Sequence, residues 1–153
     1  MDLDALNRFI VAAKRATYVG NGERATPSRA RAHDLVYEEG AWAYRDSYFG
    51  GTDFLGQEVV WLNEEPVWAM NYYGYILRQD LIDGSRSGAT LKAALTQMYV
   101  EGRFLGGIRW TGEHGTYVDR SEGDVAHFHG REYIEVGGVE AYALDYFGGL
   151  IKP

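Results

Sequence analysis

The residues best suited to chemistry in this chain are one carboxylate and the aromatic side chains around it. Asp46 lies between Tyr44 and Tyr48, and further tryptophan and tyrosine residues follow within thirty positions. A carboxylate among aromatic rings can orient a cationic or polar ligand, because the rings add cation–π and stacking contacts. The predicted ligand-binding residues are Tyr44, Asp46, Tyr48, Trp61, Trp68 and Tyr72.

Three other acids stand at the start of short apolar runs: Asp34, Glu58 and Glu132. A carboxylate on an apolar face can have a raised pKa and act as a general acid or base. The structural alternative is that such acids pair with arginine or cap backbone amides. If the chain is a small acid–base enzyme (a lyase, isomerase or hydrolase), the candidate catalytic residues are Asp46 and Glu58, with no cofactor.

Histidines form a third group. His127 and His129 are two residues apart on a predicted strand. A hairpin turning at Glu122-Gly123 would place His114 on the same face. Two histidines at this spacing can bind a metal ion. The alternative, which we favour, is a set of exposed histidines without metal.

Signatures of the common enzyme classes are absent from the sequence. It has no Gly-x-Ser-x-Gly elbow, no His-Glu-x-x-His and no dinucleotide fingerprint. The glycine-rich segment 102–112 lacks the Gly-Lys-Ser/Thr ending of a phosphate-binding loop. Absence of cysteine excludes thiol catalysis, disulfides and thiolate metal sites. We therefore favour a binding domain over an enzyme.

Length and charge limit the class of protein. A chain of 153 residues is expected to form a single domain, 1–153, with a real core. The net charge of −7 makes direct nucleic-acid binding a poor fit. No apolar stretch has the length of a membrane span, and Asp2 and Asp4 do not suit a signal peptide. We expect a soluble cytoplasmic protein whose partner is a small molecule or another protein; the oligomeric state stays open.

The elements that must position these side chains are three predicted β-hairpins with a shared pattern. Positions 56–74 align with positions 130–148 without a gap, and positions 34–50 align with 58–74. The shared unit begins with an acid and ends with a tyrosine, an aromatic residue and a glycine. The expected two-residue turns are Glu39-Gly40, Asn63-Glu64 and Gly137-Gly138. Pro66 lacks an N–H, so it must lie at an edge or a bulge.

If every hairpin has a two-residue turn, strand alternation sorts the side chains into two faces. The aromatic face carries Leu35, Tyr37, Trp42, Tyr44, Asp46, Tyr48, Val59, Trp61, Trp68, Met70, Tyr72, Tyr133, Tyr142, Leu144 and Tyr146. The other face carries Val36, Ala43, Val60, Leu62, Val67, Ala69, Ile134, Val136, Ala141 and Ala143. The small side chains suit a docked helix. The aromatic face suits a thick packed core or a ligand cavity, and both remain open.

Two helices complete the prediction. Apolar residues at helical spacing over positions 3–13 predict a first helix, capped by Asp2 and ending before Gly20-Asn21-Gly22. A second helix is expected over 91–98, capped by Ser87. The arginine-containing segment 20–32 is a solvated loop or a lid that contacts an anion. The predicted fold class is α+β, with a curved antiparallel sheet, open as a half-barrel or closed as a barrel, and two packing helices.

Several segments resemble a known family: Pro27–Arg29, Asp34–Tyr37, Tyr44–Gly51, Phe54–Trp61, Pro66–Gly74 and Tyr146–Ile151. The resemblance covers nearly the whole chain, and the segment from Asp46 to Gly74 is the most specific. The family is an uncharacterised bacterial and archaeal domain of unknown function, found alone or behind an Xre-type helix-turn-helix. The resemblance implies no reaction. A fused DNA-binding module would imply sensing, but these 153 residues contain none, and segment 102–107 departs from the family's proline-flanked pattern.

Overall fold

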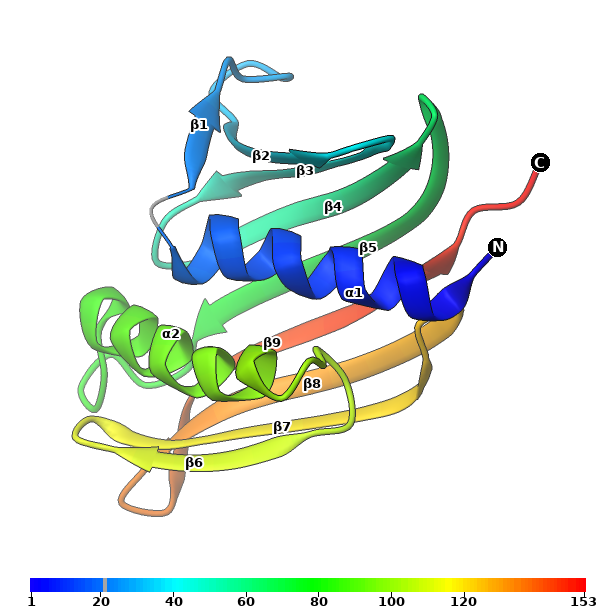
Figure 1. Ribbon diagram of the computed structural model, residues 1–153. Helices are drawn as coiled ribbons and strands as arrows, with labels where there is room; N and C mark the ends of the chain where they lie inside the picture. The colour runs from blue at the N-terminus through cyan, green and yellow to red at the C-terminus, as the bar shows by residue number, and fades with distance from the viewer. Residues whose placement is uncertain (21) are drawn as a thin grey trace.

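The computed structural model describes residues 1–20 and 22–153 (Figure 1). Asn21, in the turn predicted after the first helix, lies outside this range. Helix α1 (Leu3–Lys14) begins at the predicted cap, where the Asp2 carboxylate accepts a hydrogen bond of 3.0 Å from the Ala5 amide. A π-helical turn, η1 (Arg15–Val19), continues it. Helix α2 (Gly84–Val100) begins earlier than predicted, because Asp83 and not Ser87 is its cap.

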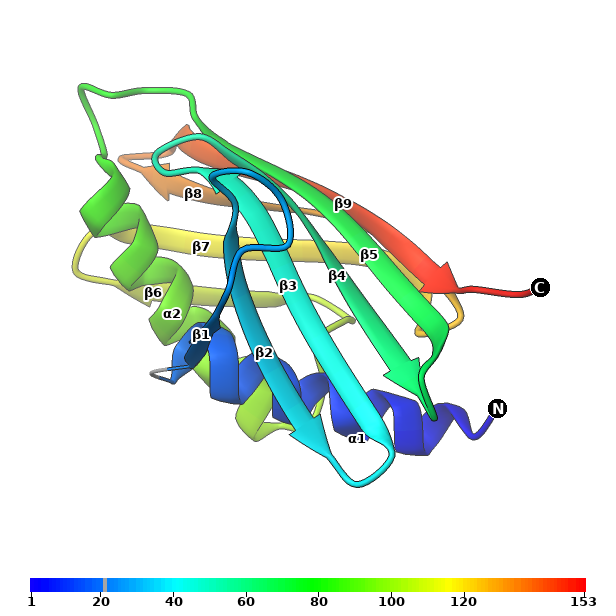
Figure 2. The same ribbon diagram turned by 90° about the horizontal axis from the view of Figure 1, so that it is seen from above.

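Nine strands form one antiparallel sheet in the order β1-β2-β3-β4-β5-β9-β8-β7-β6. Their bounds are β1 Glu23–Ala25, β2 His33–Glu39, β3 Trp42–Gly50, β4 Phe54–Leu62, β5 Glu65–Ile76, β6 Ile108–Gly112, β7 Gly115–Asp124, β8 His127–Val136 and β9 Val139–Leu150. The fold is therefore α+β with an antiparallel sheet. Within the described residues the sheet ends at β1 and β6 and is open, so the closed-barrel alternative is wrong. Figure 2 shows how strongly its strands turn from β2 to β7.

The turns decide which way each strand faces. Asn63 and Glu64 both have positive φ, as do Gly137 and Gly138, so these two-residue turns are where the sequence predicts them. The first turn is one residue later than predicted, since Glu39 pairs with Trp42. This shift leaves the assignment of faces in β2 and β3 unchanged.

A bulge in each of the other two hairpins overturns part of that assignment. The register of β4 and β5 shifts between Val60 and Trp61, next to Pro66, as a residue without an N–H requires. A second shift lies between Ile134 and Glu135. Each extra residue reverses the predicted facing of the side chains in the strand before the turn, which is β4 in one hairpin and β8 in the other. The face predicted to be aromatic therefore carries Glu58, Val60, Glu132 and Ile134, and the opposite face carries Val59, Trp61 and Tyr133.

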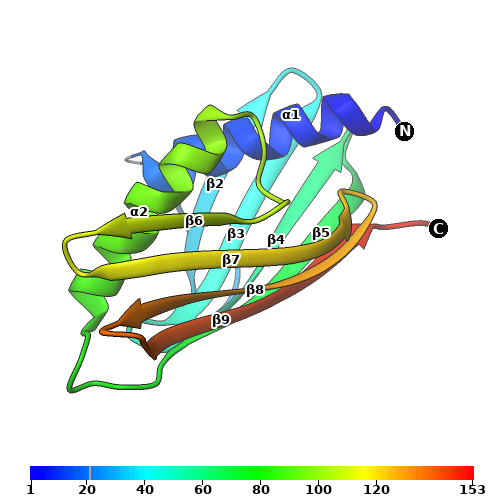
Figure 3. The ribbon, with the colours of Figure 1, turned by 90° about the horizontal axis from the view of Figure 1, so that it is seen from below.

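Both helices cover this inner, aromatic face, which corrects the expectation that they would dock on the small side chains (Figures 1 and 3). Helix α1 packs against β2 and β3, and α2 packs against β6 and β7. The outer face carries exposed Leu55, Tyr73 and Phe147. Among the described residues, no helix is long and apolar enough to cross a membrane.

Trp68 is fully buried at one end of the inner face. Its indole nitrogen donates a 3.0 Å hydrogen bond to the Val125 carbonyl. Its ring stacks on Phe128 and meets Phe104 edge-on, with centroids 5.8 Å apart in both pairs. Trp68 therefore stabilises the packed core that closes this end of the sheet.

Trp68→Phe is expected to lower the free energy of unfolding by roughly 1–3 kcal/mol, because it removes the donor to a buried carbonyl and leaves a void. Urea denaturation measures this. Trp61→Phe, on the outer face, is the matched control and should cost well under half as much. Equal costs would contradict the assignment of the two tryptophans to opposite faces.

Candidate functional site

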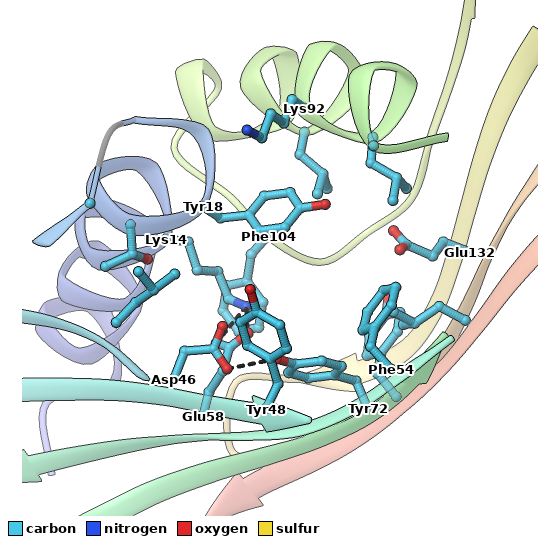
Figure 4. A pocket seen from close by; sticks show the side chains of 18 of the residues that line it. Lys14, Tyr18, Asp46, Tyr48, Phe54, Glu58, Tyr72, Lys92, Phe104 and Glu132 are labelled. Carbon is cyan, nitrogen blue, oxygen red and sulfur yellow. Dashed lines mark hydrogen bonds and ion pairs between the residues drawn. The ribbon is translucent and has the colours of Figure 1, made fainter. Parts of the chain in front are cut away.

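A cavity of about 600 Å³ lies between the two helices and the inner face of the sheet (Figure 4). Helix α1 and η1 contribute Lys14 and Tyr18, and α2 contributes apolar side chains such as Leu91 and Leu95. The sheet contributes tyrosines and four carboxylates: Asp46, Glu58, Asp119 and Glu132. Each of these carboxylates is less than a tenth exposed. The cavity therefore holds an unusual density of buried acid.

Asp46 and Glu58 form the first acid pair, opposite each other on β3 and β4. The Tyr72 hydroxyl donates a 2.6 Å hydrogen bond to Asp46 Oδ1. Burial, with the charge of Glu58, raises the pKa of Asp46 to about 7. Buried Lys14 donates a 2.8 Å hydrogen bond to Glu58 Oε1 and lies 2.7 Å from Oε2. The Lys14 ammonium therefore contacts both carboxylate oxygens of Glu58.

Asp119 and Glu132 form the second acid pair, opposite each other on β7 and β8. The Tyr146 hydroxyl donates a 2.8 Å hydrogen bond to Asp119 Oδ1, while Asp119 Oδ2 is buried without a partner among the described residues. Tyr117 and Tyr142 donate to Glu132. Burial raises the pKa of Asp119 to about 6. Burial, with the charge of Asp119, raises the pKa of Glu132 to about 7.

The two acid pairs are related by an approximate two-fold axis between β5 and β9, where Tyr72 pairs with Tyr146. Tyr72 crosses Gly56 to reach Asp46, and a Cβ at that glycine would overlap the ring. Tyr146 crosses Gly130 to reach Asp119 in the same way. One row of paired residues across the sheet is Asp46, Glu58, Met70, Gly148 and Phe128. The second row is Asp119, Glu132, Leu144, Gly74 and Phe54.

The rim of the cavity differs in charge from its interior. Exposed Arg24 on β1 and exposed Lys92 on α2 line it, together with Thr52 and Gly84 where the β3–β4 link meets the start of α2. Two cationic side chains therefore lie at the exposed edge of a cavity whose interior is acidic.

The structure brings together only part of the predicted binding set. Asp46, Tyr48 and Tyr72 line the cavity, and so does Glu58. Tyr44 is buried on the same face of the sheet, but it does not line the cavity. Trp68 belongs to the packed core, and Trp61 lies on the outer face because of the bulge beside Pro66. Neither tryptophan is placed to contact a molecule in the cavity.

The alignment of the hairpins predicts that Asp34 and Glu58 lie on the same face of the sheet, but they lie on opposite faces. The first hairpin has no bulge, so Asp34 lies on the outer face. Burial raises the pKa of Asp34, but hydrogen bonds from Ser28, Ser47 and Arg45 outweigh this effect and hold it below the usual value. Asp34 therefore fits the structural alternative, pairing with arginine.

The predicted histidine group is not assembled. The β7–β8 turn lies at Val125 and Ala126, after Asp124 pairs with His127. His114 follows β6 at the other end of the β7–β8 pair, near Glu135. Eight residues of strand separate the two ends, roughly 27 Å. In residues 1–20 and 22–153, no cluster of three or more potential metal ligands occurs.

Residues 22–32 contain strand β1 and are attached to the sheet. Arg29 donates hydrogen bonds to the carbonyl and hydroxyl of Ser47 and stacks over Phe49 at 4.5 Å. Arg24 pairs with Leu35 in the β1–β2 register. Of the predicted arginines, only Arg24 lines the cavity. A contact with an anion remains a prediction for this segment.

The residues of the site that sequence reasoning missed include Lys14, Asp119 and Tyr146. Lys14 stands one helical turn after Ile10 on the apolar stripe of α1, which is the available signal for a buried cation. Tyr146 aligns with Tyr72 in the repeated pattern. Asp119 has the same relation to Tyr146 as Asp46 has to Tyr72, but only the pairing of β7 with β8 makes this visible.

Comparison with known proteins supports the resemblance found in the sequence. The family described as a domain of unknown function, DUF5680, matches residues 46–151. This range contains all four cavity carboxylates, whereas Lys14 lies before it. No curated protein and no solved structure matches the chain. With most of its length matched, the chain belongs to the DUF5680 family of domains of unknown function.

Proposed function

We propose that this domain binds a small organic cation in the cavity between its helices and its sheet. The observation that carries the proposal is the imbalance of buried charge. Four nearly buried carboxylates line the cavity, and Lys14 is the buried cation that faces them among the described residues. Aromatic rings supply the apolar and cation–π contacts that such a ligand needs.

The volume and the lining fit a molecule of modest size. About 600 Å³ lies within the range of small-molecule sites. Tyr18, Tyr48 and Phe54 provide ring surface, and Leu91 and Leu95 provide apolar surface. A cationic group near the acids would replace lost hydration with charge-assisted hydrogen bonds. The domain would then act as a sensor or carrier of that ligand, with no reaction of its own.

Calorimetric titration with three probes of equal size tests the proposal: benzylamine, benzyl alcohol and benzoate. The amine should bind with measurable heat, while the neutral alcohol and the anion bind at least tenfold more weakly, because only the amine offers charge to the acids. Binding of benzoate equal to or tighter than that of benzylamine would contradict the proposal.

The cavity offers a matched pair of variants for this titration. Gly88 on α2 lines the cavity, and a Cβ built there meets no atom within 4 Å. Gly88→Phe should fill space near the rim and abolish amine binding, whereas Gly88→Ala should retain it. Unchanged binding in a folded Gly88→Phe protein would place the amine elsewhere.

One observation favours a second function, an acid–base enzyme without a cofactor. Burial and the neighbouring Glu58 raise the pKa of Asp46 to about 7, a value suited to proton transfer near neutral pH. Here Asp46 or Glu58 would act on a bound substrate. Asp46→Asn and Glu58→Gln should then abolish turnover while binding survives; turnover that persists in both variants would exclude this function.

A further inference from the structure

The two acid pairs of the cavity are equivalent in position but not in their partners. At the first pair, Lys14 reaches from α1 to Glu58. At the second pair, among the described residues, neither Asp119 nor Glu132 takes part in an ion pair, and Asp119 Oδ2 has no hydrogen-bond partner although Asp119 is 95% buried. The second pair therefore lacks the cation that the first pair has.

The helices explain this difference. Their inward-facing residues follow the same spacing: Ala13, Lys14 and Tyr18 on α1 with η1, and Ala94, Leu95 and Tyr99 on α2. The two helices also pack on equivalent strands, β2 and β3 for α1, β6 and β7 for α2. Leu95 thus matches Lys14 in this spacing, and both line the cavity.

Arg103 is the cation whose charge acts on Asp119, but it is held by other partners. Arg103 is paired with Glu101 at 2.8 Å and donates to the carbonyls of Leu105 and Gly107. It lowers the pKa of Asp119 only through its charge. In Figure 4 the Glu132 carboxylate lies across the cavity from Asp46, Glu58 and Lys14.

We propose that the Asp119–Glu132 pair is the half of the cavity that receives the ligand, and that the ligand carries a primary ammonium group on an apolar body. This inference rests on the proposed function and assigns its residues. The ammonium takes the place relative to Asp119 and Glu132 that Lys14 Nζ takes relative to Glu58. The apolar body lies against Phe54, Leu91 and Leu95.

Titration with n-butylamine, whose shape is that of a lysine side chain, and with benzylamine tests this assignment. Asp119→Asn should weaken amine binding about 10–100-fold, the loss of one charge-assisted contact. Asp46→Asn should weaken it less, because Lys14 already supplies positive charge at that pair. Asp145→Asn, on the exposed outer face, is the control and should leave binding unchanged.

A gain of lysine gives a second, independent test. Leu95→Lys should supply the missing cation from α2 and abolish amine binding, whereas Leu95→Met keeps the volume and should retain it. If the lysine variant does not fold, the test is the comparison of amine affinities: Asp119→Asn should weaken binding more than Asp46→Asn does.

The outcomes separate the two proposals. If the wild-type protein binds neither amine, the proposed function fails. If it binds amines but Asp46→Asn weakens binding as much as Asp119→Asn or more, the cation lies at the first pair and this assignment is wrong. Amine binding by a folded Leu95→Lys protein at wild-type strength would also overturn it.

Discussion

Lys14→Met is expected to lower the free energy of unfolding by about 3–5 kcal/mol at pH 8, because it leaves the buried Glu58 carboxylate without its cation. Lys14 and Glu58 are both less than a tenth exposed, so bulk water screens the unpaired carboxylate poorly. Urea denaturation with circular dichroism measures the change. A loss below about 1 kcal/mol would show that the pair contributes no more than an exposed one.

Two variants sharpen this experiment. Lys92→Met removes a lysine that lines the cavity but is exposed on α2, and it should cost little. In Lys14→Met/Glu58→Gln neither charge remains, so most of the lost stability should return. Failure of the double variant to recover stability would assign the effect of Lys14 to packing against Phe104, whose ring centre is 5.4 Å from Nζ.

The second large effect is on the pH dependence of stability. Three cavity acids have pKa values raised by burial: Asp46 and Glu132 to about 7, from 3.8 and 4.5, and Asp119 to about 6, from 3.8. Between about pH 4 and pH 7 the folded protein therefore binds more protons than the unfolded chain. Stability is greatest near the lower limit and falls as the pH rises through the folded-state values.

The melting temperature should accordingly be several degrees higher at pH 5 than at pH 8. Acids whose pKa is lowered, such as Asp34 and Asp83, act in the opposite sense only below about pH 4. Asp46→Asn should flatten the profile between pH 5 and pH 8, and Asp4→Asn, on the exposed first turn of α1, should not. A melting temperature that rises from pH 5 to pH 8 would contradict the burial of these acids in the folded state.

The sequence predicts the local geometry of the hairpins well. Asn63-Glu64 and Gly137-Gly138 are short-range signals for turns with positive φ, and the structure has both. The alignment of positions 56–74 with 130–148 correctly places Tyr72 and Tyr146 on one face. These features depend on neighbouring residues, so the sequence carries them directly.

The predictions that fail are those in which one extra residue reverses the face of the sheet to which a whole strand directs its side chains. The position of Pro66 predicts a bulge, but not on which strand the extra residue falls, and that choice moves Trp61 outward and Glu58 inward. The pattern of aromatic residues in the sequence does not predict that both helices pack on the aromatic face. The pairing of Lys14 with Glu58, 44 residues apart, depends on the docking of α1 and has no local signal.

The measurement that tests the cation site most directly is the position of a bound cation. Crystals of the protein soaked with para-bromobenzylamine should show anomalous scattering from bromine inside the cavity, with the ammonium group beside Asp119 and Glu132. Para-bromobenzoate under the same conditions should give no peak there. A bromine peak outside the cavity only, or equal occupancy of the cavity by the anion, would contradict the account of this domain as a binder of organic cations.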